Sequence, residues 1–166
     1  MPPSRGSGRV PATLDDTLGV TIDTAKRLDA LRLDYVVGGS VASSVHGRAR
    51  TTEDIDMVVK LPGARVEQLV ASFEADFYID ADMVHDAVVR RASFNVIHLA
   101  TMIKVDIFVF DGSEHAAKEL ERRLPVEIRN HRVWFASAED IVLQKLLWYE
   151  RGNRISERQW LDVLGV

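Results

Sequence analysis

The sequence predicts an α+β fold, a mixed β-sheet flanked by helices, and three observations support this class. Short apolar runs typical of buried strands occur along the chain, and between them apolar residues recur at helical spacing. The two kinds of segment do not alternate strictly, which favours a mixed sheet over a doubly wound parallel one. With 166 residues and 46% apolar content, the chain can bury a core that folds on its own.

The elements follow in order from apolar spacing and from the residues that cap or break each segment. Leu18, Ile22 and Leu28 recur at helical spacing and predict the first helix, Ser113 can cap a later one, and Pro62 stops a strand. The helices are expected at 14–31, 41–46, 66–73, 82–90, 113–120, 137–147 and 155–164. Strands are expected at 35–37, 55–60, 77–79, 94–99 and 102–110, with a further extended segment at 126–135.

Composition excludes several classes of protein. The absence of cysteine rules out disulfides, thiolate metal sites and thiol nucleophiles. No apolar run approaches the roughly 20 residues that cross a bilayer, and residues 1–12 lack the apolar segment of a secretory signal. The net charge of −4 argues against a general DNA coat. We expect a cytoplasmic protein with no membrane partner, in which residues 1–12 form a disordered tail and residues 13–166 a single domain.

Two aspartates interrupt the second expected strand. Strand side chains alternate between faces, so Asp54 and Asp56 share one face while their apolar neighbours share the other. Two like charges side by side repel each other unless a cation or hydrogen bonds compensate. One interpretation is a solvated strand face with Arg48 or Arg50 as partner. The alternative is a hard divalent cation, above all Mg²⁺, which binds carboxylate oxygens and keeps waters or phosphate oxygens as its other ligands.

A third carboxylate strengthens the metal interpretation. Asp106 lies in the apolar segment MIKVDIFVF, with Lys104 and Phe108 as its neighbours on the same face. An unpaired aspartate there would be costly to bury, so the alternative is a carboxylate that Lys104 satisfies. Three carboxylates on two strands favour a two-metal site.

Gly38, Gly39 and Ser40 lie between an expected strand and an expected helix. Such a turn presents backbone N–H groups and the positive end of a helix to a phosphate. The pattern is not GxGxxG, a Walker loop or GxSxG, so the enzymes that carry those motifs are poor fits. Most Gly-Gly-Ser turns are merely turns, but one placed upstream of paired carboxylates is informative.

Together these residues resemble the nucleotidyltransferase superfamily that includes DNA polymerase β and the CCA-adding enzymes. Its pattern is a Gly-Gly/Ser turn, an Asp-x-Asp flanked by hydrophobic residues, and a third acidic residue on a later strand. This chain has Gly39-Ser40, Asp54-Ile55-Asp56 and Asp106 in those places, with a spacer slightly longer than usual. The segment AEDIVLQKLLWYERG is similar to a helix motif of the small AbiEii-like, toxin-type members.

The resemblance implies a nucleotidyltransferase-like fold and a role for each matching residue. Asp54 and Asp56 would hold two Mg²⁺ ions, or Mn²⁺ in their place, and Asp106 would complete one metal site and help to deprotonate the acceptor hydroxyl. The residues assigned to nucleotide binding are Gly38, Gly39, Ser40, Arg50 and Lys145. Lys145 also keeps a structural interpretation, as a surface lysine whose stem packs on the core.

Other residues are open to both structural and functional interpretations. Tryptophans embedded in helices or strands are more often core residues than stacking platforms for a base. Basic pairs can line a groove for RNA or be solvated separately. The residues concerned are Trp134, Trp148, Trp160, Arg90, Arg91, Arg122, Arg123, Arg129 and Arg132.

The sequence supports two functions of different classes. The first is an Mg²⁺-dependent nucleotidyltransferase that moves an NMP from an NTP to a hydroxyl of tRNA or another RNA, a protein or a small molecule by a two-metal mechanism. The alternative is a catalytically weak or inactive nucleotidyltransferase-like partner of a cognate toxin or antitoxin. A third option is an α+β domain with purely structural carboxylates. Neither the preferred NTP nor the acceptor is specified by any motif.

Overall fold

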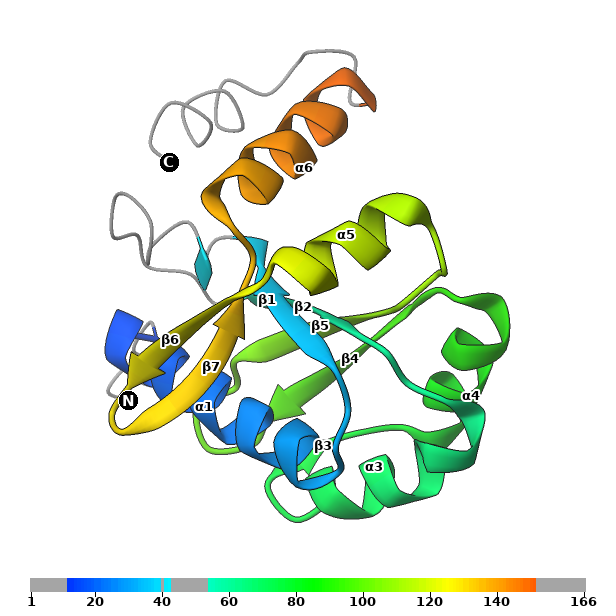
Figure 1. Cartoon of the computed structure of the whole chain (residues 1–166). Coiled ribbons are helices and arrows are strands. Elements are labelled where there is room, and N and C mark those ends of the chain that lie inside the picture. Colours follow the sequence, from blue (N-terminus) through cyan, green and yellow to red (C-terminus); the bar gives the residue numbers. More distant parts are fainter. Residues whose placement is uncertain (1–11, 40, 43–53, 152–166) are drawn as a thin grey trace, which may run out of the picture.

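A seven-stranded mixed sheet organises the protein, with strand order β3-β4-β5-β2-β1-β7-β6 (Figure 1). The computed structural model describes residues 12–39, 41–42 and 54–151. The strands are β1 (Tyr35–Gly38), β2 (Asp54–Val59), β3 (Phe77–Tyr78), β4 (Ser93–His98), β5 (Lys104–Val109), β6 (Leu124–Ile128) and β7 (His131–Phe135). The helices are α1 (Leu14–Ala30), α3 (Val66–Phe73), α4 (Ala81–Arg90), α5 (Glu114–Arg122) and α6 (Ala138–Arg151), with a 3₁₀ turn at Gly63–Arg65.

Strand β2 lies at the centre of the sheet. It pairs antiparallel with β1 and parallel with β5, and β1 in turn pairs parallel with β7. The outer pairs β3–β4, β4–β5 and β6–β7 are antiparallel. This mixture of directions, with helices on both faces, confirms the α+β class predicted from the sequence.

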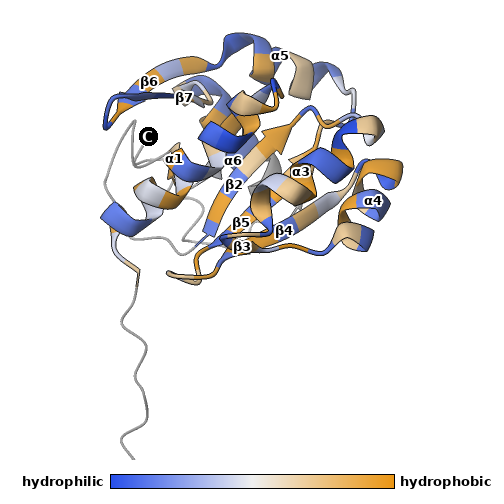
Figure 2. Ribbon diagram, turned by 90° about the horizontal axis from the view of Figure 1, so that it is seen from below, coloured by the Kyte–Doolittle hydropathy of each residue, from blue (hydrophilic) through white to orange (hydrophobic). Residues whose placement is uncertain are grey.

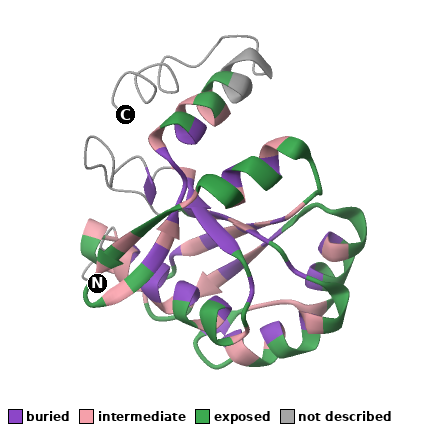
Figure 3. Ribbon diagram, in the orientation of Figure 1, coloured by how far each residue is buried: buried purple, intermediate pink, exposed green. Residues whose placement is uncertain are grey.

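The two faces of the sheet differ in what covers them. Helices α1, α3 and α4 lie on one side of the strands, and α5 and α6 lie on the other (Figure 1). On the α1 side β2 and β5 bury alternate residues, among them Ile55, Met57, Val105 and Ile107. Each such side chain contributes about 1.5–3 kcal/mol when fully removed from water. Figure 3 shows this burial concentrated along the central strands, and Figure 2 shows β2 as mostly hydrophobic.

Helix α1 begins where its sequence offers a cap. The Thr13 hydroxyl accepts a hydrogen bond from the Asp16 N–H at 3.1 Å, and the Asp16 carboxylate accepts one from the Thr13 N–H at 2.9 Å. This reciprocal capping box satisfies two N–H groups at the helix start. The helix then packs Ala25 and Leu28, both fully buried, against the sheet.

Two predicted elements differ from the structure. The extended segment 126–135 is a hairpin, because Arg129 and Asn130 both adopt left-handed backbone angles and reverse the chain between β6 and β7. The strand expected from Met102 begins at Lys104 instead, since Met102 has a positive φ of 61° and belongs to the preceding turn. The helix expected at 155–164, most of the helix at 41–46 and residues 1–11 of the tail lie outside the described residues.

Candidate active site

A row of residues crosses the middle of the sheet and brings the predicted site together. Gly38 pairs with Asp56 across β1 and β2, and Asp56 pairs with Asp106 across β2 and β5. The row continues to Asn95, which pairs with Asp106 across β5 and β4. Partners in register project to the same face, and neighbouring strands lie about 4.8 Å apart. The face on which Asp54, Asp56 and Asp106 gather is called the carboxylate face below.

Lys104 supplies a positive charge among these carboxylates. Its Nζ lies 3.1 Å from Asp106 Oδ2 and 3.8 Å from Asp54 Oδ1. The hydrogen bond to Asp106 raises the pKa of the Lys104 ammonium, and the charges of the neighbouring aspartates add to the shift. The pairing of Asp106 with Lys104, one of the two interpretations of the sequence, is therefore present in the structure. Lys104 therefore compensates part of the negative charge of this face.

Asp56 is the aspartate whose environment most disfavours its charge. Burial is the main cause, and the nearby carboxylates of Asp106 and Asp54 add repulsion, so that the pKa of Asp56 rises to about 6. The Lys104 ammonium acts in the opposite direction but does not cancel these effects. A further cation at this position would stabilise the ionised form of the carboxylate.

Gly39 is required where it stands. Its φ of 61° is in the left-handed region, and a Cβ at this position would lie 2.1 Å from Asp56 Oδ2. No other residue can therefore bring the backbone this close to the carboxylate. The Gly-Gly turn at the end of β1 is thus directly coupled to the Asp-x-Asp strand beside it.

Of the remaining residues assigned to nucleotide binding, the structure describes only Lys145. Ser40 and Arg50, and with them Arg48, lie outside the part of the chain that the structure describes. Lys145 lies on α6, partly exposed, directly after Gln144, whose side-chain oxygen is 3.5 Å from where a Cβ on Gly38 would be. Helix α6 therefore passes over the end of β1, while the role of Lys145 in binding phosphate stays a prediction.

Sequence reasoning missed Glu119, which lies at the same place. Its side chain on α5 is only 3% exposed, and its Oε1 is 4.0 Å from where a Cβ on Gly38 would be. Burial, helped by the negative charge of Asp140, raises the pKa of Glu119 to about 7. Among the described residues it has no hydrogen-bond or ion-pair partner. The sequence contains one signal of this burial. Glu119 follows Ala116 by three residues, so the two residues share the buried face of α5.

Glu119 lines a cavity of about 470 Å³ on the carboxylate face. The floor includes Val58 of β2 and Phe108 of β5, each two positions along the strand from Asp56 or Asp106. Helix α5 and Gln144 of α6 contribute the walls. The cavity is therefore next to the carboxylates and opens onto the same face.

Asp140, in the first turn of α6, has a structural role. It is 2% exposed, and the Ser137 hydroxyl donates to its Oδ2 at 2.9 Å while accepting from its backbone N–H at 3.2 Å. Arg122 lies 3.7 Å away from its other oxygen. These contacts fix the start of α6.

The carboxylates match the ligand chemistry of magnesium but are not preassembled around one point. Three aspartates on two adjacent strands provide the hard oxygen donors that Mg²⁺ selects. Within the described ranges, however, no three acidic or histidine side chains are gathered closely enough to hold a metal ion as they stand. Lys104 currently neutralises two of them.

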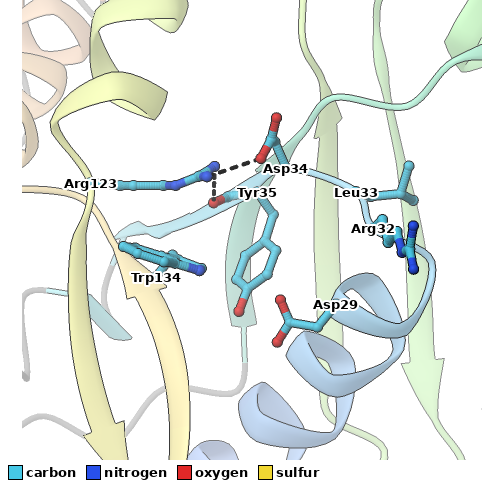
Figure 4. A pocket seen from close by; sticks show the side chains of 7 residues that line it. All are labelled: Asp29, Arg32, Leu33, Asp34, Tyr35, Arg123 and Trp134. Carbon is cyan, nitrogen blue, oxygen red and sulfur yellow. Dashed lines mark hydrogen bonds and ion pairs between the residues drawn. The ribbon is translucent and has the colours of Figure 1, made fainter.

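A second, smaller cavity of about 210 Å³ lies at the opposite end of β1, and Trp134 forms part of its lining (Figure 4). The Arg123 guanidinium lies 4.9 Å from the centre of the Trp134 ring, and it donates to the Tyr35 carbonyl oxygen at 3.3 Å and to Asp34 at 2.9 Å. Arg123 therefore covers Trp134 and ties the β6–β7 hairpin to β1. The side chain of Trp148 and all of Trp160 lie outside the described residues.

Solved structures of other proteins share this architecture and identify the fold. A nucleotidyltransferase-like antigenic protein from Paracoccidioides brasiliensis matches with a TM-score of 0.64 and 24% identity over 93% of this chain and 75% of its own. A putative nucleotidyltransferase from Thermotoga maritima matches at 0.61 and 15% over 93% and 98%. A lincosamide antibiotic adenylyltransferase with lincomycin bound matches at 0.58 and 11% over 93% and 96%. The fold is that of the nucleotidyltransferases.

The family follows from the sequence itself. Residues 17–160 match the model of a family described as nucleotidyltransferases of unknown function, DUF6036, and the chain belongs to that family. No curated protein matches the sequence. None of the helices in the described ranges is both long and apolar enough to span a bilayer.

Proposed function

We propose that the protein is an Mg²⁺-dependent nucleotidyltransferase that moves an NMP from an NTP to the hydroxyl of an acceptor. The row Gly38–Asp56–Asp106 carries this proposal, because it sets a phosphate-binding turn beside two carboxylates on one face. The family and fold supply the class of reaction. The enzyme of similar fold with lincomycin bound is a lincosamide antibiotic adenylyltransferase, which supports a small-molecule acceptor as one option beside RNA or protein.

Each group of residues has its own role in the proposed reaction. Asp54, Asp56 and Asp106 would hold two Mg²⁺ ions, which supply charge neutralisation for the triphosphate and a lower pKa for the acceptor hydroxyl. Asp106 accepts the proton of that hydroxyl as its oxygen bonds to the α-phosphorus and pyrophosphate leaves. The backbone N–H groups after Gly38 and Gly39, with Ser40, orient the phosphates, and Arg50 and Lys145 add positive charge.

The ammonium of Lys104 gives this site an additional property. It compensates the charges of Asp106 and Asp54 before a metal binds, and a metal that takes these carboxylates displaces its 39% exposed side chain toward solvent or phosphate. A cation beside the phosphates suits phosphoryl transfer, in which positioning and electrostatic stabilisation dominate.

Thermal unfolding with each of the four NTPs, with Mg²⁺ or with EDTA, tests the proposal. A ligand at a hundredfold excess over Kd stabilises the folded state by about 2.7 kcal/mol. We expect an Mg²⁺-dependent shift for wild type and for the exposed control Asp82→Asn, and none for Asp56→Asn or Asp106→Asn. Transfer of label from the preferred [α-³²P]NTP to tRNA, protein or small molecules should show the same pattern. Equal shifts in all four proteins would show that Asp56 and Asp106 do not bind the metal–nucleotide complex.

One observation favours the second candidate, a weak or inactive partner in a toxin–antitoxin pair of the AbiEii-like type. Lys104 already pairs with two of the three carboxylates, and the described residues hold no ready metal group. This candidate predicts a stable complex with a second small protein and no consumption of nucleotide by either protein. Purification from the native source, followed by mass analysis and an NTP turnover assay, separates the two.

A further inference from the structure

The cavity against Glu119 has a place and a size that the metal and nucleotide roles do not use. Its floor at Val58 and Phe108 lies two residues, about 6.6 Å of strand, from the Asp56–Asp106 pair. Its volume of about 470 Å³ is within the range of pockets that bind small molecules. A molecule held there would be adjacent to the carboxylate row, on the face where the reaction is proposed to occur.

Glu119 is the feature of this cavity that points to a ligand. A buried carboxyl group without a hydrogen-bond partner is costly, and native proteins rarely keep one. Asp140 behind it is satisfied by Ser137 and Arg122, so it repels Glu119 without offering it a donor. A donor that enters through the cavity, water or a ligand, can reach this carboxyl group.

The charges around the cavity indicate the kind of donor. The Arg91 guanidinium on the rim donates to the backbone carbonyl oxygen of Asp111 at 2.9 Å. The Asp111 carboxylate accepts from the Ser113 N–H at 2.8 Å, and hydrogen bonding by the Ser113 side chain and then by this N–H lowers the pKa of Asp111. The carboxyl of Glu119 and the amide of Gln144 line the cavity beside the apolar surface of Phe108, together with the polar side chains of Ser93 and His115. Such a lining suits a compact molecule with an apolar body and a protonated amine.

We infer that this cavity binds the acceptor, and that the acceptor is a small molecule carrying a protonated amine in addition to its reactive hydroxyl. The inference rests on the proposed nucleotidyl transfer and names its substrate class. The amine donates to Glu119 and stays chemically unchanged. The hydroxyl oxygen bonds to the α-phosphorus, its proton passes to Asp106, and the bond to pyrophosphate breaks with its electron pair leaving on pyrophosphate. Glu119 therefore selects and positions the acceptor.

Binding of two matched probes tests the inference without any turnover. The probes are trans-4-aminocyclohexanol and its neutral counterpart trans-1,4-cyclohexanediol, titrated into ¹⁵N-labelled protein and followed by NMR. The variants are Glu119→Gln, which keeps the shape and removes the ionisable group, and Glu121→Gln, the same change at an exposed position of α5. Each protein is also titrated with ATP and Mg²⁺, as an independent report on the nucleotide site.

We expect aminocyclohexanol to shift the amide signals around Phe108, Ala116 and Gln144, with an affinity at least about tenfold weaker in Glu119→Gln and unchanged in Glu121→Gln. The diol should bind more weakly than the amine to wild type. If the amine binds Glu119→Gln as tightly as wild type, or shifts signals elsewhere, the inference is overturned. Normal binding of Mg²⁺–ATP in the same protein would leave the proposed nucleotidyl transfer intact without this acceptor site. Amine binding at Glu119 in a protein that never binds nucleotide overturns the acceptor role together with the proposed function.

Discussion

The backbone of Gly39 and the carboxylate of Asp56 are so close that a single methyl group cannot be placed between them. A Cβ on Gly39 would lie 2.1 Å from Asp56 Oδ2 and 3.0 Å from its Cγ. The glycine turn and the Asp-x-Asp strand, read in the sequence as two separate motifs, are therefore one structural unit. Any change in the turn is transmitted directly to the carboxylate.

Gly39→Ala should disable the site. The left-handed backbone costs a non-glycine residue about 1–2 kcal/mol, and the new Cβ must displace the Asp56 carboxylate. A shift of about 1 Å is enough to lower a reaction rate by about a hundredfold. Urea unfolding and Mg²⁺–ATP binding measure the two effects.

Gly112→Ala is the matched control for this change. Gly112 also has a positive φ, of 79°, but a Cβ there would meet only the end of the flexible Arg91 side chain at 3.2 Å. It should lose similar stability and keep its nucleotide affinity. If both variants lost affinity equally, backbone strain and not the contact with Asp56 would be responsible.

Lys104→Met should tighten the binding of Mn²⁺ at pH 8. The ammonium competes with a metal for Asp106 and Asp54, so its removal leaves more negative charge on this face for the metal to neutralise. For one partly exposed ion pair we expect roughly a fivefold gain, equivalent to about 1 kcal/mol. Electron paramagnetic resonance counts the free Mn²⁺. Lys118→Met, which removes an exposed lysine paired with Glu114 on α5, should leave the affinity unchanged.

Glu119→Gln should stabilise the protein at alkaline pH. The folded-state pKa of Glu119, about 7, lies above its value of 4.5 in an unfolded chain, so the wild type loses stability as the pH rises from about 4.5 to about 7 and no further above that. The neutral amide avoids this loss, which amounts to about 2–3 kcal/mol at pH 8 and vanishes near pH 4.5. Urea unfolding across this range measures the difference. A constant difference at every pH would contradict the raised pKa.

Arg123→Met should loosen the β6–β7 hairpin and leave nucleotide binding intact. The change removes the contact with the Trp134 ring and the hydrogen bonds to Tyr35 and Asp34, together worth about 1–2 kcal/mol. Arg132→Met, at a 62% exposed position of the same hairpin, should cost less than about 0.5 kcal/mol. Urea unfolding followed by tryptophan fluorescence compares the two. Equal losses would show that Arg123 does not anchor the hairpin.

Local patterns predicted the elements of this fold because each is decided by nearby residues. Alternation placed Asp54 and Asp56 on one face, and the apolar surroundings of Asp106 indicated both a strand and a pairing with Lys104. The hairpin turn at Arg129 and Asn130 was missed because it contains no glycine, and only the asparagine marked it.

The assembly of the site could not be predicted in the same way. The pairing of Asp56 with Asp106 depends on which strands become neighbours, and no local spacing encodes that choice. Glu119 was missed because a glutamate in a short charged helix is usually solvated. Its burial follows only from the way α5 lies on β1, beneath Gln144 of α6.

The parallel pair β2–β5 has a consequence for how the protein is made. Asp54 and Lys104 are partners although a 3₁₀ turn, helices α3 and α4 and strands β3 and β4 are synthesised between them. Contacts so distant in sequence close slowly, after the intervening elements have formed. During translation the Asp-x-Asp segment leaves the ribosome long before its partner strand exists, and Glu119 and Gln144 follow later still. The nascent chain therefore carries its acidic motif without the strand that completes the row Gly38–Asp56–Asp106, and this row is assembled only when the fold is nearly complete.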